Sequence, residues 1–387
     1  MNVDVAIVGA GLVGGSLAAA LSGAGVSVAL IDARSEPQDA GASEAFDQRV
    51  FALRPGSKQF LQACGVWAHI DEERTAPVYR MLVTGDDGGS QLRFDAYRSG
   101  VAELAVIAED RELRSAMHAA LAASPLVSRI EASCESIHME DQGATVVLDD
   151  GDPVQARLLV AADGGRSRVR DLAGLRVREH PYGHSAVVAN FAASRPHHGT
   201  AWQWFRNDGV LALLPLPGPH VSMVWSARQE LAEELMALDR DALAARVSEA
   251  SAGVAGELSA AGAPATFPLR LMRAESIVGA RLALVGDAAH NVHPLAGQGL
   301  NLGLADAQAL AAIIARRGPD EVGSAALLAR YRRSRAEDIM AMTFATDGLH
   351  RLFQSSLPGV SWLRNTGLRI TERVAPLKRL LVKHAAG

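Results

Sequence analysis

The N-terminal segment constrains the fold of this chain more than any other stretch. A short apolar run leads into a glycine-rich turn, an alanine-rich stretch predicts a helix over Leu12–Ala24, and a second apolar run, Val26–Ile31, ends in Asp32. This order of strand, turn, helix, strand and acid is typical of the unit that binds a dinucleotide at the carboxyl ends of parallel strands. Glycines and serines interrupt the segment and acidic Asp4 precedes it, which argues against a membrane span or a signal peptide.

Glycine is needed at each position of the G-x-G-x-x-G turn for a different physical reason. Gly9 permits the tight turn, Gly11 lets backbone approach a pyrophosphate, and Gly14 lets the helix pack on the strand. Asp32 lies eighteen residues after Gly14, where a carboxylate can hold ribose hydroxyls. The segment therefore predicts a dinucleotide site.

A second glycine-rich segment lies far along the chain. The apolar run Leu282–Val285 predicts a buried strand that ends at Gly286 and Asp287, and a loop rich in proline and glycine then leads to a helix from about Leu300 to Ala315. Such a loop brings backbone N–H groups and a helix N-terminus to one point, which suits an electron-rich, anion-like ligand. We expect the two glycine-rich segments to meet at one ligand.

Two weaker signals lie between these segments. Asp163 and Gly164 follow an apolar run and precede a basic stretch, so they would face the ligand crevice at the end of a strand. Arg111 lies in an acidic helix start, and arginine can pair with a pyrophosphate. Taken alone, the first would be an ordinary turn before a solvated basic helix, and the second a surface helix with charge pairs.

The composition limits the remaining choices. With 387 residues, 49% of them apolar and 21% charged, the chain has room for two domains, or one large mixed domain with an insertion, and for a full core. A net charge of −5 gives no reason to expect nucleic acid as a partner. Cys64 and Cys134 form no C-x-x-C pattern, which favours a reducing compartment and no zinc or other metal site.

Together, these motifs resemble the single-component flavoprotein aromatic hydroxylases. The segment His293–Asp306, H-P-L-A-G-Q-G-L-N-L-G-L-A-D, is similar to the signature of the ubiquinone-biosynthesis hydroxylases, and Asp47–Leu53 matches their D-x-R-x-x-A-L pattern. Stretches at 201–205, 211–216 and 224–225 add to the likeness, which spans nearly the whole chain. The first segment is highly specific, whereas many FAD and NAD proteins share the N-terminal glycine turn.

The resemblance implies an α/β fold. It combines a Rossmann-like FAD-binding domain of the glutathione-reductase type, an inserted β-rich substrate domain and a C-terminal helical segment. We expect the discontinuous FAD-binding domain at residues 1–75, 100–178 and 270–345, the substrate domain at 76–99 and 179–269, and the C-terminal helices at 346–387. Apolar strands favour a largely parallel sheet in the first domain.

The inserted domain has its own patterns. Alternating residues predict strands over Ser185–Phe191 and His220–Ala227, and helical spacing predicts one helix over Glu230–Ala250. Four apolar residues are candidate walls of the substrate pocket, with simple sheet core as the alternative for each: Phe205, Leu213, Pro215 and Trp225.

The resemblance also implies which residues contact FAD. Gly9, Gly11 and Gly14 would line its pyrophosphate, and Asp32 its adenosine ribose. Asp163 would serve both FAD placement and the nicotinamide donor. On the phosphate or flavin side, Arg49 and Arg111 would reach the cofactor, and Asp287 would hold the ribityl chain. Pro294 would lie beside the ring, and the backbone of Gly299, Leu300 and Asn301 would face its pyrimidine end. The same set of cofactor-binding residues includes Gly286, Gly297 and Gln298.

The implied chemistry follows from the cofactor. NAD(P)H reduces FAD, the reduced flavin forms a C4a-hydroperoxide with O₂, and an oxygen atom passes to the aromatic ring of a polyprenylated phenol in ubiquinone biosynthesis. The pocket must exclude water, and a helix dipole near residues 299–301 would stabilise negative charge on reduced flavin. No general base is assigned. His184 (where the family pattern leads us to expect glutamine), Tyr182 and His293 are weak candidates for assisting phenol deprotonation, and a structural role is favoured for each.

The C-terminal segment 346–387 differs in charge from the rest of the chain. It holds seven lysines and arginines against Asp347 and Glu372, with apolar residues interleaved. Basic amphipathic helices can lie on anionic lipid, whereas a helical layer on the FAD domain with a solvated basic face is the favoured alternative. We expect a cytoplasmic protein, with peripheral association with the inner face of the membrane or with a biosynthetic complex as a further hypothesis.

Three functions compete at this point. The favoured one is the FAD-dependent hydroxylase. The second is a flavin-dependent reductase of similar fold that acts on a prenyl chain, and the third is a non-catalytic flavoprotein subunit of a biosynthetic complex. NAD(P)H-dependent oxygen uptake with a phenolic substrate separates the first from the other two.

Overall fold

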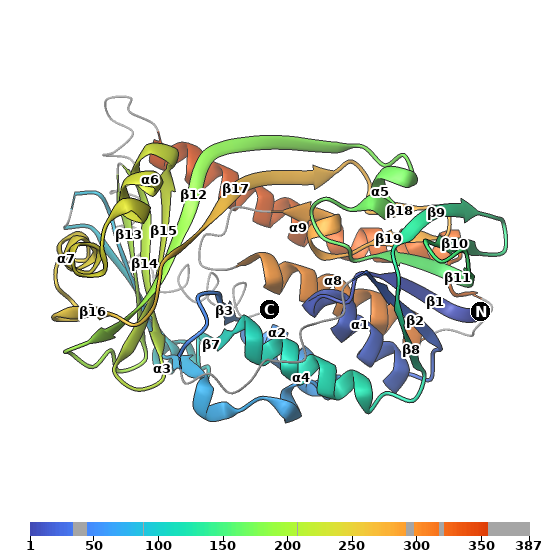
Figure 1. The fold of residues 1–387 in the computed structure, drawn as a ribbon, viewed down its shortest axis with the longest axis horizontal. Coiled ribbons are helices and arrows are strands. Elements are labelled where there is room, and N and C mark those ends of the chain that lie inside the picture. The colour runs from blue at the N-terminus through green and yellow to red at the C-terminus, as the bar shows by residue number, and fades with distance from the viewer. Residues whose placement is uncertain (34–44, 88, 207, 292–297, 317–320, 355–387) are drawn as a thin grey trace.

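The computed structural model describes residues 1–33, 45–87, 89–206, 208–291, 298–316 and 321–354 (Figure 1). Within this part of the chain, a parallel sheet with its helices forms one end of the molecule, and a larger mixed sheet forms the other. A three-stranded sheet joins them, made of β3 (Val50–Leu53), β7 (Ala105–Glu109) and β4 (Ala76–Val78). The expected α/β class is confirmed.

The first sheet is built on five parallel strands. Their order is β19 (Leu282–Leu284), β11 (Pro153–Ala161), β1 (Asn2–Val8), β2 (Val28–Asp32) and β8 (Val127–Glu131). Antiparallel pairing adds β18 (Val278–Gly279) beside β19, β10 (Ala144–Leu148) beside β11, and β9 (Cys134–Met139) beside β10. The central strands are apolar at almost every position because protein covers both of their faces.

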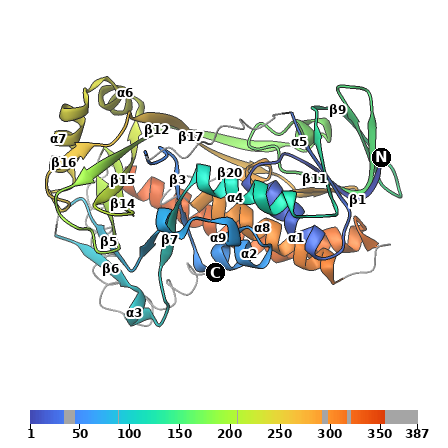
Figure 2. The same cartoon turned by 60° about the horizontal axis from the view of Figure 1, so that its bottom comes forward.

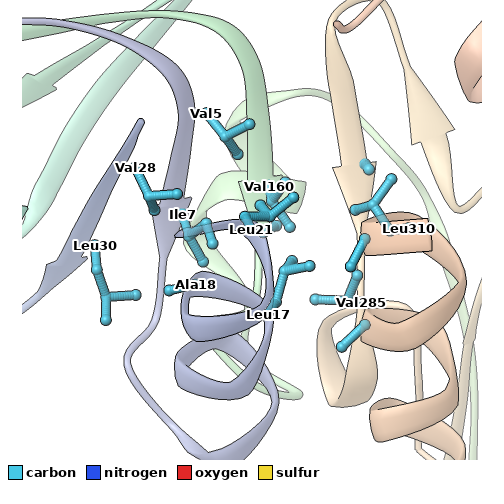
Figure 3. Packing of buried hydrophobic residues seen from close by; sticks show 14 of the residues in the cluster. Val5, Ile7, Leu17, Ala18, Leu21, Val28, Leu30, Val160, Val285 and Leu310 are labelled. Carbon is cyan, nitrogen blue, oxygen red and sulfur yellow. The ribbon is translucent and has the colours of Figure 1, made fainter. Parts of the chain in front are cut away.

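Helix α1 (Leu12–Gly23) is packed between the first sheet and α8 (Gln298–Ala315). Figure 3 shows Leu17 and Leu21 of α1 lying between Ile7 and Val160 on the strands and Leu310 on α8. Helix α4 (Asp110–Ala122) packs beside α1, and α9 (Ala325–Gln354) packs on α8. Shorter helices include α2 (Pro55–Ala63), α3 (Ala96–Ser99) and α5 (Arg168–Leu172).

The second sheet has nine strands. Their order is β20 (His290–Asn291), β17 (Ala265–Ala274), β12 (Val177–Ala193), β15 (His220–Arg228), β14 (Gly209–Leu216), β13 (Thr200–Arg206), β5 (Arg80–Thr84) and β6 (Gln91–Asp95), with β16 (Leu258–Ala260) also paired to β12. Strand β13 runs parallel to β5, and the other pairs are antiparallel. The long strands β12 and β17 span both ends of the molecule in two views (Figures 1 and 2).

The expected single helix over Glu230–Ala250 is wrong, because the structure has two helices there. Helix α6 covers Gln229–Ala237 and α7 covers Arg240–Ala250. The backbone turns extended at Leu238, with ψ 144°, and the Asp239 side chain accepts a hydrogen bond from the Ala242 N–H at 2.8 Å. A carboxylate at this position caps a new helix rather than extending the old one.

Alternation along the strands gives the second sheet two different faces. Helices α6 and α7 cover one face, where Leu213 and Trp225 are fully buried. These two residues are therefore sheet core rather than pocket walls, and Pro215 shares the Leu213 face by the two-residue period. Phe205 packs instead with Val83 and Leu92 of the edge strands. The opposite face of the sheet is turned toward the first part of the molecule.

Candidate functional site

A cavity of about 440 Å³ lies between the two parts of the molecule. Its lining joins both glycine-rich segments to the uncovered face of the second sheet. The first part contributes Gly11, Leu12, Val13, Asp110, Arg114, Ala162, Gly164, Val285, Asp287, Gly299 and Leu300, and the second contributes Ala186, Val188, Gln203, Val210, Ala212, Leu214, Val224, Ser226, Phe267, Pro268, Leu269 and Asn291. Residues Gln48–Phe51 complete it.

The N-terminal glycines occupy three different environments. Gly9 has a φ of +108°, and a side chain there would collide with the backbone of Ala162. A Cβ at Gly14 would collide with the Gly9 carbonyl oxygen, so this glycine lets α1 approach the turn. At Gly11, in contrast, no described protein atom lies within 4 Å of an added Cβ. Protein packing thus explains Gly9 and Gly14, whereas Gly11 faces open space in the cavity.

The N-terminus of α1 opens into the same space. No side chain caps the helix, and its first turn carries no acidic residue. Its free N–H groups and the positive end of its dipole would therefore attract an anion. Asp32, at the end of β2, accepts a hydrogen bond from the Ala10 N–H at 2.6 Å and so fixes the backbone of the glycine turn.

A buried ionic cluster supports the second turn. Asp306, the last residue of the specific motif, has no exposed surface and accepts a hydrogen bond from the Gly286 N–H at 3.0 Å. Arg335 donates to its other carboxylate oxygen at 2.8 Å, and His290 Nε2 lies 2.7 Å from Asp306 Oδ2. Burial alone would raise the pKa of Asp306, but the contacts with His290 and Arg335 outweigh this effect and hold the pKa below its ordinary value.

Asp287 follows Gly286 in this turn and reaches the cavity. Its side chain is exposed to the open cavity, but the cavity walls partly desolvate the carboxyl and raise its pKa, while His290, Arg49 and Arg270 oppose the rise. Because Asp306 anchors the Gly286 backbone, it fixes where Asp287 points. Sequence reasoning missed Asp306, His290 and Arg335, although an acid within the apolar helix 300–314 was a visible signal.

The N-terminus of α8 forms a third side of the cavity. The helix begins at Gln298, and Gly299 and Leu300 line the cavity. Asn301 is buried and uses its side chain structurally, because its amide donates to the Ala52 carbonyl at 2.8 Å and accepts from the Arg54 N–H at 2.9 Å. These bonds tie α8 to the end of β3, which leaves the backbone of the first turn of α8 to face the cavity.

The segment 47–49 connects three elements around the cavity. Buried Glu109 accepts a hydrogen bond from the Asp47 N–H at 2.5 Å, and the Asn190 side chain on β12 donates to the Asp47 carbonyl at 2.8 Å. Arg49 then lines the cavity with its guanidinium 5.0 Å from the centre of the Phe51 ring. This arrangement brings a cation toward Asp287 and the glycine turn.

Like Asp32 and Asn301, three further predicted residues lie beside the cavity rather than in its lining. Arg111 Nη2 donates to the Ala45 carbonyl at 3.0 Å, and Arg114, one turn later, faces the cavity instead. The Asp163 carboxylate accepts from the Val169 N–H at 3.1 Å, and burial raises its pKa. His184 is buried on β12 after an irregularity in the pairing with β17. Their proposed roles toward FAD or substrate stay predictions.

Several predicted positions fall outside the described residues. These are His293, Pro294 and Gly297, together with the segment 355–387 of the C-terminal prediction. For Gln298 and Tyr182 only the backbone is described. Among the described residues, no cluster of histidine, cysteine, aspartate and glutamate is arranged to hold a metal ion.

The described residues fit an FAD molecule. Gly11 and Gly299 both leave space where a side chain would stand, α1 lacks a side-chain cap, and Arg49 adds positive charge. A pyrophosphate would satisfy the N-terminus of α1, and the cavity continues from there past Asp287 to the first turn of α8.

Comparisons with known proteins agree with this geometry. The sequence profile of the family described as "FAD binding domain" matches residues 2–346. The ubiquinone hydroxylase UbiL of Rhodospirillum rubrum is 38% identical over 99% of this chain and 89% of its own length, and the 3-demethoxyubiquinol 3-hydroxylase of Escherichia coli is 34% identical over 99% and 98%. Among solved structures, the chain resembles PqsL of Pseudomonas aeruginosa, which is described as a probable FAD-dependent monooxygenase. The TM-score is 0.77 at 25% identity, and the match covers 96% of this chain and 100% of PqsL. The p-nitrophenol 4-monooxygenase PnpA of Pseudomonas putida shares the fold, with a TM-score of 0.80 at 20% identity, over 100% of this chain and 99% of its own. With two relatives above 30% identity over almost its full length, this chain belongs to the FAD-binding domain family of flavoprotein monooxygenases that its motifs indicated.

Proposed function

We propose that this protein is an FAD-dependent monooxygenase that hydroxylates the aromatic ring of a polyprenylated phenol in ubiquinone biosynthesis. The observation that carries the proposal is the single cavity that runs from the glycine turn and the N-terminus of α8 to the uncovered face of the second sheet. Relatives named as ubiquinone hydroxylases supply the substrate class.

Bound FAD would supply the redox chemistry, taking electrons from NAD(P)H and activating O₂ for transfer to the ring. The protein's own residues supply placement. The N-terminus of α1 and the open position at Gly11 would bind the pyrophosphate, and Asp287 would hold the ribityl chain. The first turn of α8 would place its N–H groups and its dipole beside the pyrimidine end of the flavin.

The second sheet supplies an apolar wall that excludes water and shapes the substrate pocket. Its contribution to the cavity is mainly apolar, with Val188, Ala212 and Val224 side by side in the register of neighbouring strands. Such a wall excludes water from the site of oxygen transfer, which protects the activated oxygen until the ring is in place. It also suits an aromatic ring with an isoprenoid tail.

The direct test is oxygen consumption by the purified flavoprotein. With NADH or NADPH and an ortho-prenylated phenol, we expect substrate-dependent oxygen uptake and a product that has gained one oxygen atom by mass spectrometry. A product with a saturated prenyl chain would favour a reductase. An unchanged level of pathway product in a strain that carries Asp287→Ala, with FAD binding lost, would favour a non-catalytic subunit.

We also propose that the basic C-terminal segment docks the protein at an anionic membrane surface, where a lipid-tailed phenol would enter. Among the described residues, no helix has the length and apolar character needed to cross a bilayer. The charges of the segment motivate the idea, because lysines and arginines exceed acids there by five. Flotation with anionic vesicles should carry the full chain but not a chain that ends at Gln354, and equal flotation of the two would contradict it.

A further inference from the structure

Gln203, in the middle of β13, is a buried amide that points into the cavity. Its side chain is 6% exposed and lines the cavity wall. In the described part of the chain, no group forms a hydrogen bond with this amide. Buried polar groups are almost always paired, so an unpaired one that faces a cavity points to a partner that is not part of the protein.

Other amides around the cavity differ in this respect. Gln48 also lines it, but its Nε2 donates to the Ala263 carbonyl at 2.8 Å. Asn190 uses its Nδ2 to hold the Asp47 carbonyl, and Asn301 bridges α8 to β3 through both ends of its amide. These three side chains position the walls of the cavity. Gln203 has no such structural task among the described residues.

The register of the sheet defines what surrounds Gln203. Ala212 stands directly opposite it on β14, Val224 is opposite Ala212 on β15, and Val188 is opposite Val224 on β12. These side chains share one face because they are direct cross-strand partners. Among the residues that line the cavity, the amide therefore ends an otherwise apolar row, since its partner on β5, Val83, lies outside the lining. The small side chain of Ala212 leaves room beside it for a flat ring.

We propose that Gln203 binds the ring oxygen of the substrate and so selects phenols, an inference that rests on the proposed function. The Oε1 atom accepts the phenolic O–H, and the Nε2 group donates to a second oxygen on the ring where one is present. An amide does not take the proton, but accepting a hydrogen bond from the phenol raises electron density on the ring. The same contact fixes which ring carbon faces the flavin.

The test compares a phenol with its methyl ether. Isothermal titration calorimetry of the FAD-bound protein with an ortho-prenylated phenol and with its O-methyl ether measures binding without requiring turnover. Wild type should bind the phenol about tenfold more tightly, which is the size expected for one hydrogen bond in a dry site. Gln203→Leu should bind the ether as wild type does and lose the preference for the phenol. Gln203→Glu, which keeps an acceptor, should retain part of it.

Ser222→Ala is the matched control. Ser222 is fully buried on the same sheet, and it lies outside the cavity lining. We expect this variant to keep the preference, and FAD content and melting temperature to stay unchanged in Ser222→Ala and Gln203→Leu. Equal discrimination by wild type and Gln203→Leu, or no phenol binding by wild type, would overturn the inference. If phenol binding depends on Gln203 but no hydroxylated product forms, the inference is supported and the proposed function is contradicted.

Discussion

The two walls of the cavity are built by different physical means. On the side of the first sheet, backbone carries the site: glycine turns and two helix N-termini present N–H groups, and buried contacts behind them hold the backbone in place. On the side of the second sheet, side chains alternate between a helix-covered core and a mainly apolar cavity face. The first wall tolerates almost no change in backbone position, whereas the second is tuned by the size and polarity of single side chains.

The largest expected effect on stability is that of Gly14→Ala, which disrupts the cavity wall on the side of the first sheet. The added methyl group would collide with the Gly9 carbonyl oxygen and approach the Ala162 side chain, so α1 must move away from the turn. We expect a loss of more than about 4 kcal/mol in the free energy of unfolding, beyond the usual cost of overpacking. Urea denaturation and the yield of soluble, FAD-containing protein measure it.

Gly11→Ala is the control for that substitution. Its backbone, with φ −66°, accepts alanine, and no described atom lies within 4 Å of the new methyl group. The variant should therefore unfold within about 0.5 kcal/mol of wild type when FAD is absent. It should nevertheless bind FAD at least tenfold more weakly, because the methyl group stands where the pyrophosphate would lie. Wild-type FAD affinity would contradict the placement of the cofactor.

The second effect concerns the buried ionic cluster behind the Gly286–Asp287 turn. Asp306→Asn removes the buried carboxylate that faces Arg335 and leaves this arginine paired with the exposed carboxylate of Asp338, which should cost about 3 kcal/mol in the free energy of unfolding. The pKa of Asp306 is lowered in the folded protein, so its stabilisation is complete above the unfolded pKa of about 4. That stabilisation falls away as pH drops toward the folded pKa.

Unfolding by urea at pH 7 and at about pH 3 tests this sign. The difference between wild type and Asp306→Asn should be largest at neutral pH and should shrink in acid, because the unfolded wild-type chain then binds a proton at Asp306 that the folded state takes up only at lower pH. A difference that is constant with pH would show that the carboxylate charge does not contribute. Glu337→Gln, on the exposed side of α9, should show no such pH dependence.

The same contrast explains what the sequence could predict. Gly9, Gly14 and Asp287 belong to turns whose glycine spacing is visible in one segment, and the parallel α/β fold follows from the apolar strands around them. Pocket residues on the second sheet carry no such signature. Leu213 and Ala212 are neighbours on one strand, and only the unseen partner layer decides that Leu213 packs on α6 and α7 while Ala212 faces the cavity.

Long-range partners were also invisible in the sequence. Asp306 and Arg335 lie on two different helices, and no local spacing announces their ion pair. The break between α6 and α7 was missed because helical periodicity continues through it. The Asp239 side chain caps α7 and outweighs that pattern locally. Gln203 stands inside a motif that pointed to the family, but only its burial without a partner distinguishes it.

A pair of substitutions on β14 separates the two faces of the second sheet. Leu213→Ala removes a fully buried side chain from the core beneath α6 and α7, and we expect it to cost about 2 to 3 kcal/mol. Ala212→Val adds volume toward the open cavity and should change the free energy of unfolding by less than about 0.5 kcal/mol. It should weaken phenol binding severalfold. Comparable losses of stability in both variants would mean that the cavity face is packed as tightly as the core.

The smallest effect on stability is expected at Asp287, where the two walls meet. The cavity walls partly desolvate the Asp287 carboxyl and raise its pKa in the folded protein, although the side chain is exposed to the open cavity. Ionisation of this carboxyl therefore opposes folding by a small amount as pH rises above its unfolded pKa. Asp287→Asn removes that opposition while keeping the shape of the side chain. The FAD-free variant should therefore be at least as stable as wild type at pH 7, and its advantage should disappear below the unfolded pKa, where the wild-type carboxyl is also neutral.

Binding of FAD should change in the other direction. The asparagine keeps one oxygen toward the cavity but loses the charge that accepts strongly from ribityl hydroxyls, so FAD affinity should fall by roughly tenfold. Thermal unfolding with and without added FAD measures both quantities in one experiment. Asp152→Asn, in an exposed turn far from the cavity lining, should alter neither. A destabilised FAD-free Asp287→Asn would show that this carboxylate is held for the fold rather than for the cofactor.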